Sequence, residues 1–137
     1  MGIVRDSTVF IAAERQGLNA RQTLANIAAR FPAEQSAMSV VTLVELAHGA
    51  ARANTPARKS ARQRFISELA TALPVHSVTA SIALRAGQID GENTAKGIRI
   101  ALSDLLIGVT ALELGYEVVT ANVRHFQMIP GLGVTVL

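Results

Sequence analysis

Three acidic residues and one asparagine stand where a sheet of parallel strands would bring them together. Asp6 follows a short apolar segment, Glu45 and Asp104 lie within apolar runs, and Asn122 follows a later apolar segment. Carboxylates held close together repel one another unless a cation neutralises them, and an all-oxygen ligand set suits Mg²⁺ or Mn²⁺. Such an ion polarises a phosphate and activates a water, so phosphodiester hydrolysis needs no nucleophilic side chain. We therefore take these four residues as candidate catalytic residues, with the three acids as candidate metal ligands.

Each of these residues also has a purely structural interpretation. Asp6 could cap the helix that follows it, and Asn122 could cap a short turn. Glu45 could pair with Thr42 in a capping box, and Asp104 could complement a helix dipole from the first turn. The apolar surroundings of Glu45 and Asp104 favour chemistry, because a carboxylate in such a setting is seldom without a role.

The composition limits how the chain could bind a polyanion. It has no cysteine, which excludes disulfides, thiolate metal sites and cysteine nucleophiles. The net charge is +3, carried mainly by arginine, whose planar side chain suits phosphate. Aromatic residues make up only 4% of the chain, too few for a base-stacking surface. Any RNA would therefore be bound through its phosphates.

Several basic side chains are candidate phosphate contacts. A helix that opens at Pro56 carries a basic group that either steers RNA or is simply a solvated face. If it steers RNA, reversing two of its charges weakens RNA binding and flattens the salt dependence of binding. The group comprises Arg58, Lys59, Arg62 and Arg64, and Arg124 is a separate candidate near the end of the chain.

The histidines and one further acid carry weaker signals. His125 is either a surface residue beside a turn or a contact to phosphate or metal. Glu14 follows the first acid by about two helical turns and could approach the same cleft as an accessory residue. The Glu-x-x-His spacing that ends at His48 is typical of di-iron helices, which need the motif twice. We interpret His48 and His76 as structural.

Short apolar segments alternate with helical patterns along the whole chain. This order predicts a parallel α/β sheet with helices on both faces, whose active crevice lies beyond the carboxyl ends of the strands. Ser103 is expected to be the N-cap of the helix that carries Asp104, and Asn19 and Gln22 have the spacing of a capping box. The predicted strands are 3–4, 36–41, 74–78, 116–120 and 134–137, and the predicted helices follow Asp6, span 19–31 and 42–51, begin at 56 and 79, and end at Gly115.

Length and hydrophobicity set the class of protein. A chain of 137 residues predicts one domain, 1–137, and a hydrophobic content of 50% excludes intrinsic disorder. The longest uncharged stretch, 69–84, is interrupted by Pro74 and is shorter than the roughly 20 apolar residues of a membrane span. Arg5 and Asp6 interrupt any apolar core of a signal peptide. We therefore expect a cytoplasmic protein that does not enter a membrane.

Four segments and the ending of the chain resemble the PIN domain, and within it the VapC-type toxins of bacterial toxin–antitoxin pairs. Each motif alone is weak, but the resemblance covers essentially the whole chain with the motifs in the family's order. The segments are Ile3–Ile11, Ser39–Gly49, Ser103–Ala111, Thr120–Phe126 and Ile129–Leu132.

The resemblance implies a three-layer α/β/α sandwich with a short, mostly parallel central sheet. It also implies an endoribonuclease dependent on Mg²⁺ or Mn²⁺ that cleaves structured RNA such as tRNA or rRNA. Asp6, Glu45 and Asp104 match the family's metal-binding acids, and Thr8 matches its supporting hydroxyl. Ser103 and His125 stand beside these positions as further supporting residues. Proteins of this type usually form homodimers and are inhibited by a cognate VapB-like antitoxin.

The sequence departs from the family at its fourth acidic position. The family usually has an acid at the position of Asn122, at that of His125, or at both, and neither is acidic here. Loss of this charge would weaken binding of a second metal ion. The alternative function is therefore a catalytically weak or inactive PIN-like module that binds RNA or regulates, and retains antitoxin or metal binding. A phosphorelay receiver is disfavoured, since neither Lys59 nor Lys96 follows the final strands.

Overall fold

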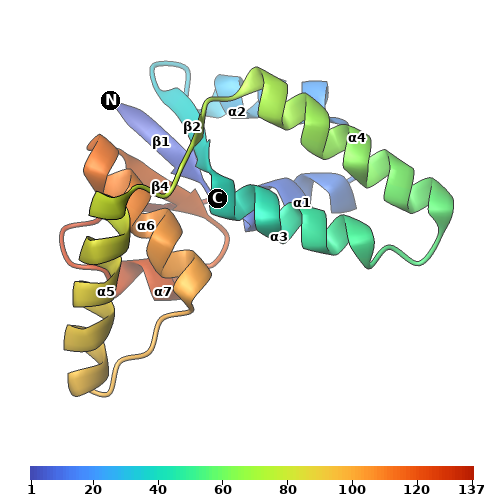
Figure 1. Ribbon diagram of the computed structural model, residues 1–137. Helices are drawn as coiled ribbons and strands as arrows, with labels where there is room; N and C mark the ends of the chain where they lie inside the picture. The colour runs from blue at the N-terminus through green and yellow to red at the C-terminus, as the bar shows by residue number, and fades with distance from the viewer.

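Strands and helices alternate from one end of the chain to the other. A computed structural model describes residues 1–137, and its alternation of elements agrees with the predicted α/β class. The elements, labelled in Figure 1, are β1 (Gly2–Arg5), α1 (Ser7–Arg15), α2 (Ala20–Arg30), β2 (Gln35–Ser39), α3 (Val40–Ala51), α4 (Pro56–Ala72), β3 (Val75–His76), α5 (Ala80–Ala95), α6 (Leu102–Leu114), β4 (Glu117–Thr120), α7 (Val123–Gln127) and β5 (Val134–Val136).

The five strands form one parallel sheet in the order β3-β2-β1-β4-β5. The chain therefore builds the sheet outward from β1 in one direction and then returns to add β4 on its other side. In open α/β sheets, ligands bind beyond the carboxyl ends of the strands where the order reverses in this way. That point lies between β1 and β4, where Asp6 and Thr120 stand.

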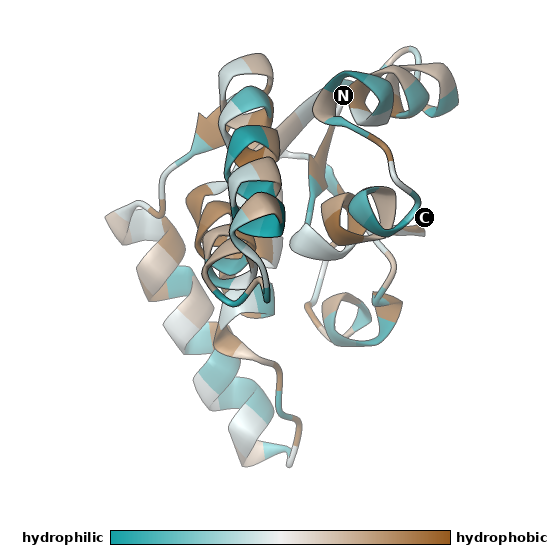
Figure 2. Ribbon diagram, turned by 90° about the vertical axis from the view of Figure 1, so that its right-hand side faces the viewer, coloured by the Kyte–Doolittle hydropathy of each residue, from teal (hydrophilic) through white to brown (hydrophobic).

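Two hydrophobic cores cover the two faces of the sheet. Ile3 and Val119 point into a core formed with α1, α2, α3 and α4, and their neighbours Val4 and Val118 point into a core formed with α5, α6 and α7. This alternation is the two-residue period of a strand buried on both faces. Figure 1 shows α5, α6 and α7 grouped on one side, and Figure 2 shows both hydrophobic and polar segments along the helices. The predicted three-layer α/β/α architecture is confirmed.

The start of α3 differs from the prediction. The strand predicted to reach Val41 ends at Ser39, and α3 begins at Val40 instead of Thr42. The Ser39 hydroxyl accepts a hydrogen bond from the Val41 N–H at 3.1 Å, so it caps the helix two residues early. The capping-box interpretation of Glu45 is therefore wrong. Thr42 lies inside the helix and donates instead to the Arg5 carbonyl at 3.5 Å.

The predicted N-cap of α6 is also wrong. The Leu105 N–H donates to the Ala101 carbonyl, so the helix begins at Leu102 and Ser103 already lies within the first turn. Asp104 stays in that first turn, as predicted, and Gly115 ends the helix in the left-handed conformation with φ of 69°.

The remaining boundaries show smaller differences. The capping box of Asn19 and Gln22 is present with both hydrogen bonds, and β3 shortens to Val75–His76. The segment predicted as a turn after Asn122 is the short helix α7, held in place by the fully buried Phe126. None of the helices has the length and apolar content needed to cross a membrane.

Candidate active site

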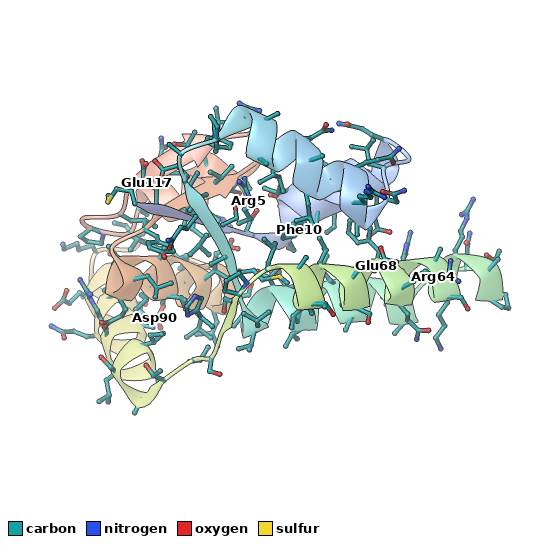
Figure 3. All side chains as sticks on the ribbon, turned by 90° about the horizontal axis from the view of Figure 1, so that it is seen from above. Arg5, Phe10, Arg64, Glu68, Asp90 and Glu117 are labelled. Carbon is teal, nitrogen blue, oxygen red and sulfur yellow. The ribbon has the colours of Figure 1, made fainter.

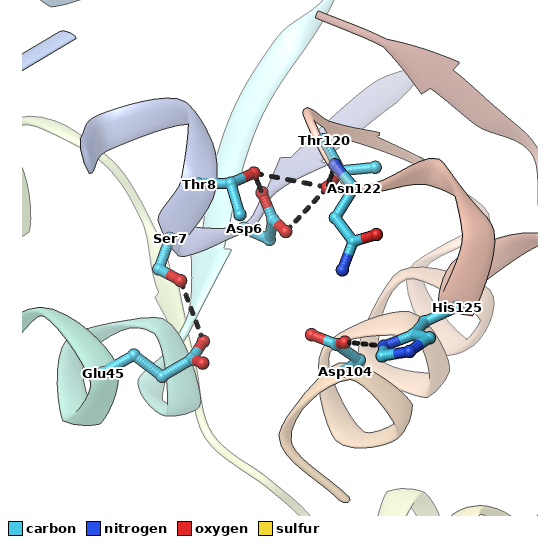
Figure 4. A network of polar contacts seen from close by, with 8 residues as sticks. All are labelled: Asp6, Ser7, Thr8, Glu45, Asp104, Thr120, Asn122 and His125. Carbon is cyan, nitrogen blue, oxygen red and sulfur yellow. Dashed lines mark hydrogen bonds and ion pairs between the residues drawn. The ribbon is translucent and has the colours of Figure 1, made fainter. Parts of the chain in front are cut away.

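Asp6 leaves the end of β1 with its carboxylate held by two hydroxyls. Thr8 Oγ1 donates to Asp6 Oδ1 at 2.6 Å, and Thr120 Oγ1 donates to Asp6 Oδ2 at 2.7 Å (Figure 4). The Ala121 N–H donates in turn to Thr8 Oγ1 at 3.0 Å. Asp6 occupies the N-cap position of α1, and the Val9 N–H in the first turn lowers the pKa of its carboxyl slightly, although the two hydroxyls are its close hydrogen-bond partners. The two hydroxyls orient the carboxylate toward the end of the sheet.

Glu45 reaches the same region from α3. Ser7 Oγ donates to Glu45 Oε1 at 3.1 Å, which fixes the side chain against the start of α1. Burial raises the pKa of Glu45, and the nearby charges of Asp104 and Asp6 raise it further, whereas the hydroxyls of Ser7 and Ser103 lower it. Ser103 therefore supports the site by lying beside Glu45, although it does not cap α6.

Asp104 and His125 form a close pair. His125 Nδ1 lies 2.7 Å from Asp104 Oδ2, close enough for an Nδ1–H to donate to the carboxylate. Both side chains are largely buried, with exposed fractions of 33% for His125 and 15% for Asp104. His125 is therefore not a free surface residue. This contact joins α7 to the first turn of α6.

The side chain of Asn122 lies between the acids and does not cap the helix that follows it. Its side chain makes no capping hydrogen bond to α7, so the capping interpretation is wrong for this residue too. Its backbone N–H donates to Thr120 Oγ1 at 2.9 Å. Figure 4 shows its amide directed toward the space between Asp6 and Asp104. The amide is therefore free to contact a ligand.

The three carboxylates face one another from β1, α3 and α6 (Figure 4). No lysine or arginine forms an ion pair with any of them. Burial raises the pKa of Asp6 above its usual 3.8, and the charge of Asp104 adds to this effect, although the hydroxyls of Thr8 and Thr120 oppose it. The acids therefore form a negative cluster without a lysine or arginine partner.

The donor chemistry of this cluster fits a hard divalent cation. Three carboxylates and an amide oxygen are the ligand types that Mg²⁺ and Mn²⁺ prefer. No three histidine or acidic side chains are close enough here to hold one ion by themselves. Mg²⁺ usually retains several waters and uses only one or two carboxylates directly, so this spacing is compatible with such an ion.

The raised pKa of Asp6 predicts how stability responds to its removal. A carboxyl with a raised pKa in the folded state binds its proton more tightly there, so stability is greatest below the unfolded pKa and falls as pH rises through the folded pKa. In metal-free buffer at pH 7, Asp6→Asn is expected to raise the Tm by roughly 2–5 °C. Thermal unfolding from pH 3 to 7 measures this, and the difference should vanish below about pH 4. A lower Tm for the variant at pH 7 would show that the hydroxyl contacts outweigh the burial of charge.

The basic residues of α4 differ in whether they contact other parts of the protein or are exposed to solvent. Arg62 Nη1 donates to the Gly49 carbonyl at 2.9 Å, and Arg62 Nε lies 3.8 Å from Glu14 Oε2. Arg58 is exposed, although it donates to Asn54 Oδ1 at 3.0 Å. Lys59, Arg64 and Arg124 are also exposed. Arg62 is thus mainly a structural link between α3, α4 and α1.

A pocket of about 430 Å³ lies between part of this basic group and Glu45. Glu45 and Glu14 line it together with Arg15, Arg58 and Arg62. Burial raises the pKa of Glu14, and the nearby charge of Arg62 lowers it. Glu14 therefore shares a pocket with Glu45, and neither Asp6 nor Asp104 lines that pocket.

Sequence reasoning missed Ser7 and Thr120, and it missed the partner of His125. The signal for Ser7 was its place next to Asp6, and the signal for Thr120 was a hydroxyl at the end of an apolar strand. Both contacts depend on which strands and helices become neighbours. His48 and His76 make no hydrogen bond or ion pair with the acids.

Comparisons with known proteins place the chain in a family. A model of the PIN domain matches residues 3–131. The tRNA(fMet)-specific endonuclease VapC of Salmonella typhimurium is 36% identical over 110 residues, which cover 78% of this chain and 80% of that protein.

Solved structures agree with this assignment. The DNA-bound VapBC structure from Salmonella typhimurium gives a TM-score of 0.78 at 26% identity, covering 99% of this chain and 98% of the other. VapBC2 from Rickettsia felis, bound to a DNA fragment from its promoter, gives a TM-score of 0.84 at 22% identity. The match covers 100% of this chain and 99% of the other and shows that the two share a fold. The chain therefore belongs to the PIN domain family, in its VapC group.

Proposed function

We propose that this protein is a Mg²⁺- or Mn²⁺-dependent endoribonuclease, the toxin of a VapBC-type toxin–antitoxin pair. The observation that carries the proposal is the cluster of Asp6, Glu45 and Asp104, which has no lysine or arginine partner, at the carboxyl ends of β1 and β4. The named activity of the Salmonella relative, a tRNA(fMet)-specific endonuclease, supports RNA as the substrate and tRNA as its first class to test. Residues 1–137 would act as one PIN-like domain.

The side chains of the cluster have two roles. The carboxylates would bind the ion, and neighbouring hydroxyls hold two of these carboxylates in place. Asp6, Glu45 and Asp104 would hold the divalent ion, which supplies a polarised phosphate oxygen and a more acidic bound water. Thr8 and Thr120 fix the Asp6 carboxylate, and Ser7 fixes that of Glu45.

Two further side chains have roles in the site. One would contact the substrate, and the other positions Asp104. Asn122 has a free amide whose NH2 can donate to a phosphodiester oxygen. His125 holds one oxygen of Asp104 and thereby limits how that carboxylate turns. These contacts preorganise the site before the substrate arrives.

The direct test is cleavage of RNA by the purified, antitoxin-free protein. Total cellular RNA is incubated with Mg²⁺, with Mn²⁺ and with EDTA, beside an Asp6→Asn/Asp104→Asn double variant as the contamination control. Discrete cuts that need the metal and are absent from the variant are expected. Cuts made equally by the double variant, or in EDTA, would refute the proposed site.

A catalytically weak module is the second candidate, and the contact between His125 and Asp104 favours it. The fourth position carries a neutral amide and an imidazole, and the imidazole holds one oxygen of Asp104 at 2.7 Å. Such a protein would bind RNA, metal or antitoxin with little turnover. Metal-dependent RNA binding without cuts would be its signature.

His125→Asp tests whether the missing charge at the fourth position limits activity. If the missing charge limits activity, the added carboxylate is expected to raise Mg²⁺-dependent cleavage by about tenfold, because it strengthens binding of the ion. The measurement is the cleavage rate as a function of Mg²⁺ concentration. His125→Asn is the matched control, since it removes the imidazole without adding charge. No gain in either variant would mean that three acids suffice or that the site is inactive.

The exposed cations of α4 give a prediction about binding. Arg58→Glu/Lys59→Glu is expected to weaken RNA binding about tenfold at low salt and to flatten its salt dependence, because fewer counterions are released. Fluorescence anisotropy with labelled RNA at several salt concentrations measures both. Lys96→Glu/Arg99→Glu, at two exposed positions between α5 and α6, makes the same change in net charge. Equal loss in both double variants would assign the effect to net charge alone.

We also propose which proteins this chain binds and where in the cell it acts. The Salmonella VapBC structure supports a VapB-like antitoxin as the partner. Exposed Val44, Leu84 and Leu102 supply apolar surface for burial in a homodimer or against the antitoxin. We place the protein in the cytoplasm with its RNA substrate. Light scattering of the protein alone and with its antitoxin tests the assembly, and a monomer at all concentrations would refute the homodimer.

A further inference from the structure

Arg5 is a fully buried cation whose charge no acid neutralises. It lies on β1 with an exposed fraction of 0%, in the interior beside α2 (Figure 3). Its Nη2 donates to Ser36 Oγ at 3.1 Å, and its guanidinium lies 5.1 Å from the centre of the Phe31 ring. Its Nε and Nη1 have no hydrogen-bond partner. No carboxylate forms an ion pair with it.

This arrangement is costly for the protein on its own. A buried charge needs both a counter-charge and hydrogen bonds, and Arg5 has one hydrogen bond and no counter-charge. Burial, and then the charge of Arg30, lower the pKa of Arg5 to about 10, so it is still protonated at neutral pH. An anion placed beside Arg5 would satisfy the two free nitrogens and neutralise the charge.

A pocket lies against this position. Nε and Nη1 of Arg5 are themselves fully covered, so an anion in the pocket reaches them by displacing part of the pocket wall. The pocket has a volume of about 210 Å³ and lies between α1, α2 and the end of β5, with Arg5 and Arg30 both lining it. Arg30 lies 5.6 Å from the centre of the Phe31 ring, so the two guanidinium groups approach the same aromatic side chain. Most of the other lining residues are apolar, among them Val9, Ala13, Leu18, Ile27 and Leu137. None of the lining residues belongs to the acidic cluster.

We propose that this pocket binds a carboxylate carried on a short apolar stem, of the size of an acidic side chain. The two free nitrogens of Arg5 and the exposed Arg30 would hold the carboxylate, and the apolar walls would contact the stem. A phosphate fits less well, because its second charge costs more to remove from water in a mainly apolar pocket. The volume of about 210 Å³ leaves room for a small organic acid.

Butyrate is the first probe, and butyramide and inorganic phosphate are its comparisons. Calorimetric titration of the full chain is expected to show saturable binding of butyrate and none of butyramide, which has the same stem without the charge. N-acetyl-glutamate amide presents the carboxylate as a peptide would. Tighter binding of this compound would assign the site to a partner segment, and tighter binding of the free acid would assign it to a small metabolite. Tighter binding of phosphate would overturn the choice of carboxylate.

Arg5→Met provides the decisive variant, because it keeps the volume and removes the charge. It is expected to weaken butyrate binding at least tenfold and to unfold, without anion, at a temperature no lower than the wild type. Arg30→Gln, at the exposed mouth, is expected to weaken binding several-fold and keeps the test available if Arg5→Met does not fold. Arg99→Gln, an exposed arginine far from the pocket, is the control. Wild-type affinity in both Arg5→Met and Arg30→Gln would overturn the proposal, whatever the outcome of the cleavage assay.

Discussion

Asp104→Asn is expected to lower RNA cleavage about a thousandfold. The substitution removes one of three negative charges that face the proposed metal position, and the matching loss of transition-state stabilisation is about 4 kcal/mol. Asn also keeps the side-chain shape, so α6 should retain its structure. Single-turnover cleavage of a defined RNA at saturating Mg²⁺ measures the change.

The control for this variant lies in the same helix. Glu113→Gln removes an exposed carboxylate near the other end of α6, where it pairs with Arg85 at 3.7 Å. It changes the net charge by the same amount and should cleave RNA at the wild-type rate. Comparable rates for Asp104→Asn and wild type would remove Asp104 from the reaction centre.

Phe126→Ala is expected to destabilise the protein by about 3–5 kcal/mol. Phe126 has an exposed fraction of 0% and packs in the core shared by α5, α6 and α7. Gly108 leaves the space for this packing, because a Cβ there would meet the side chains of Ile129, Leu132 and Phe126. Urea unfolding measures the loss. Gln63→Ala, at an exposed position of α4, should change stability by less than about 0.5 kcal/mol.

The effect of this substitution should extend to the site. Phe126 is the buried anchor of α7, and its neighbour His125 contacts Asp104. A loosened α7 would free Asp104 and displace Asn122, so cleavage should change even where the variant remains folded. A stable variant with unchanged cleavage would show that α7 is held by other contacts.

Local chemistry made much of this structure predictable from the sequence. The capping box at Asn19, the left-handed Gly115 and the alternation of strands with helices depend on neighbouring residues only, and all are present. Parallel topology then places Asp6 and Asn122 at one edge of the sheet, since each follows a strand. A single sequence therefore contains the information needed to predict these features.

The contacts that hold the acids in place were not predictable in the same way. Ser7 meets Glu45 because α3 packs beside α1, and Thr120 meets Asp6 because β4 pairs with β1. His125 meets Asp104 because α7 lies against α6. Each is a property of tertiary packing between segments far apart in the chain. The start of α3 was missed for another reason, since the Ser39 cap outweighs the strand preference of Val40 and Val41.

The hydrogen bond between Thr120 and Asp6 joins residues separated by 114 positions in the chain. Contacts of such long sequence separation form late and slowly, because loop closure must precede them. During synthesis, Asp6 leaves the ribosome well before the strand that completes its surroundings. A nascent chain therefore carries all the residues of α1 without an assembled reaction centre. Under the proposed function, the placement of β1 between β2 and β4 delays ribonuclease activity until β4 has emerged from the ribosome and paired with β1.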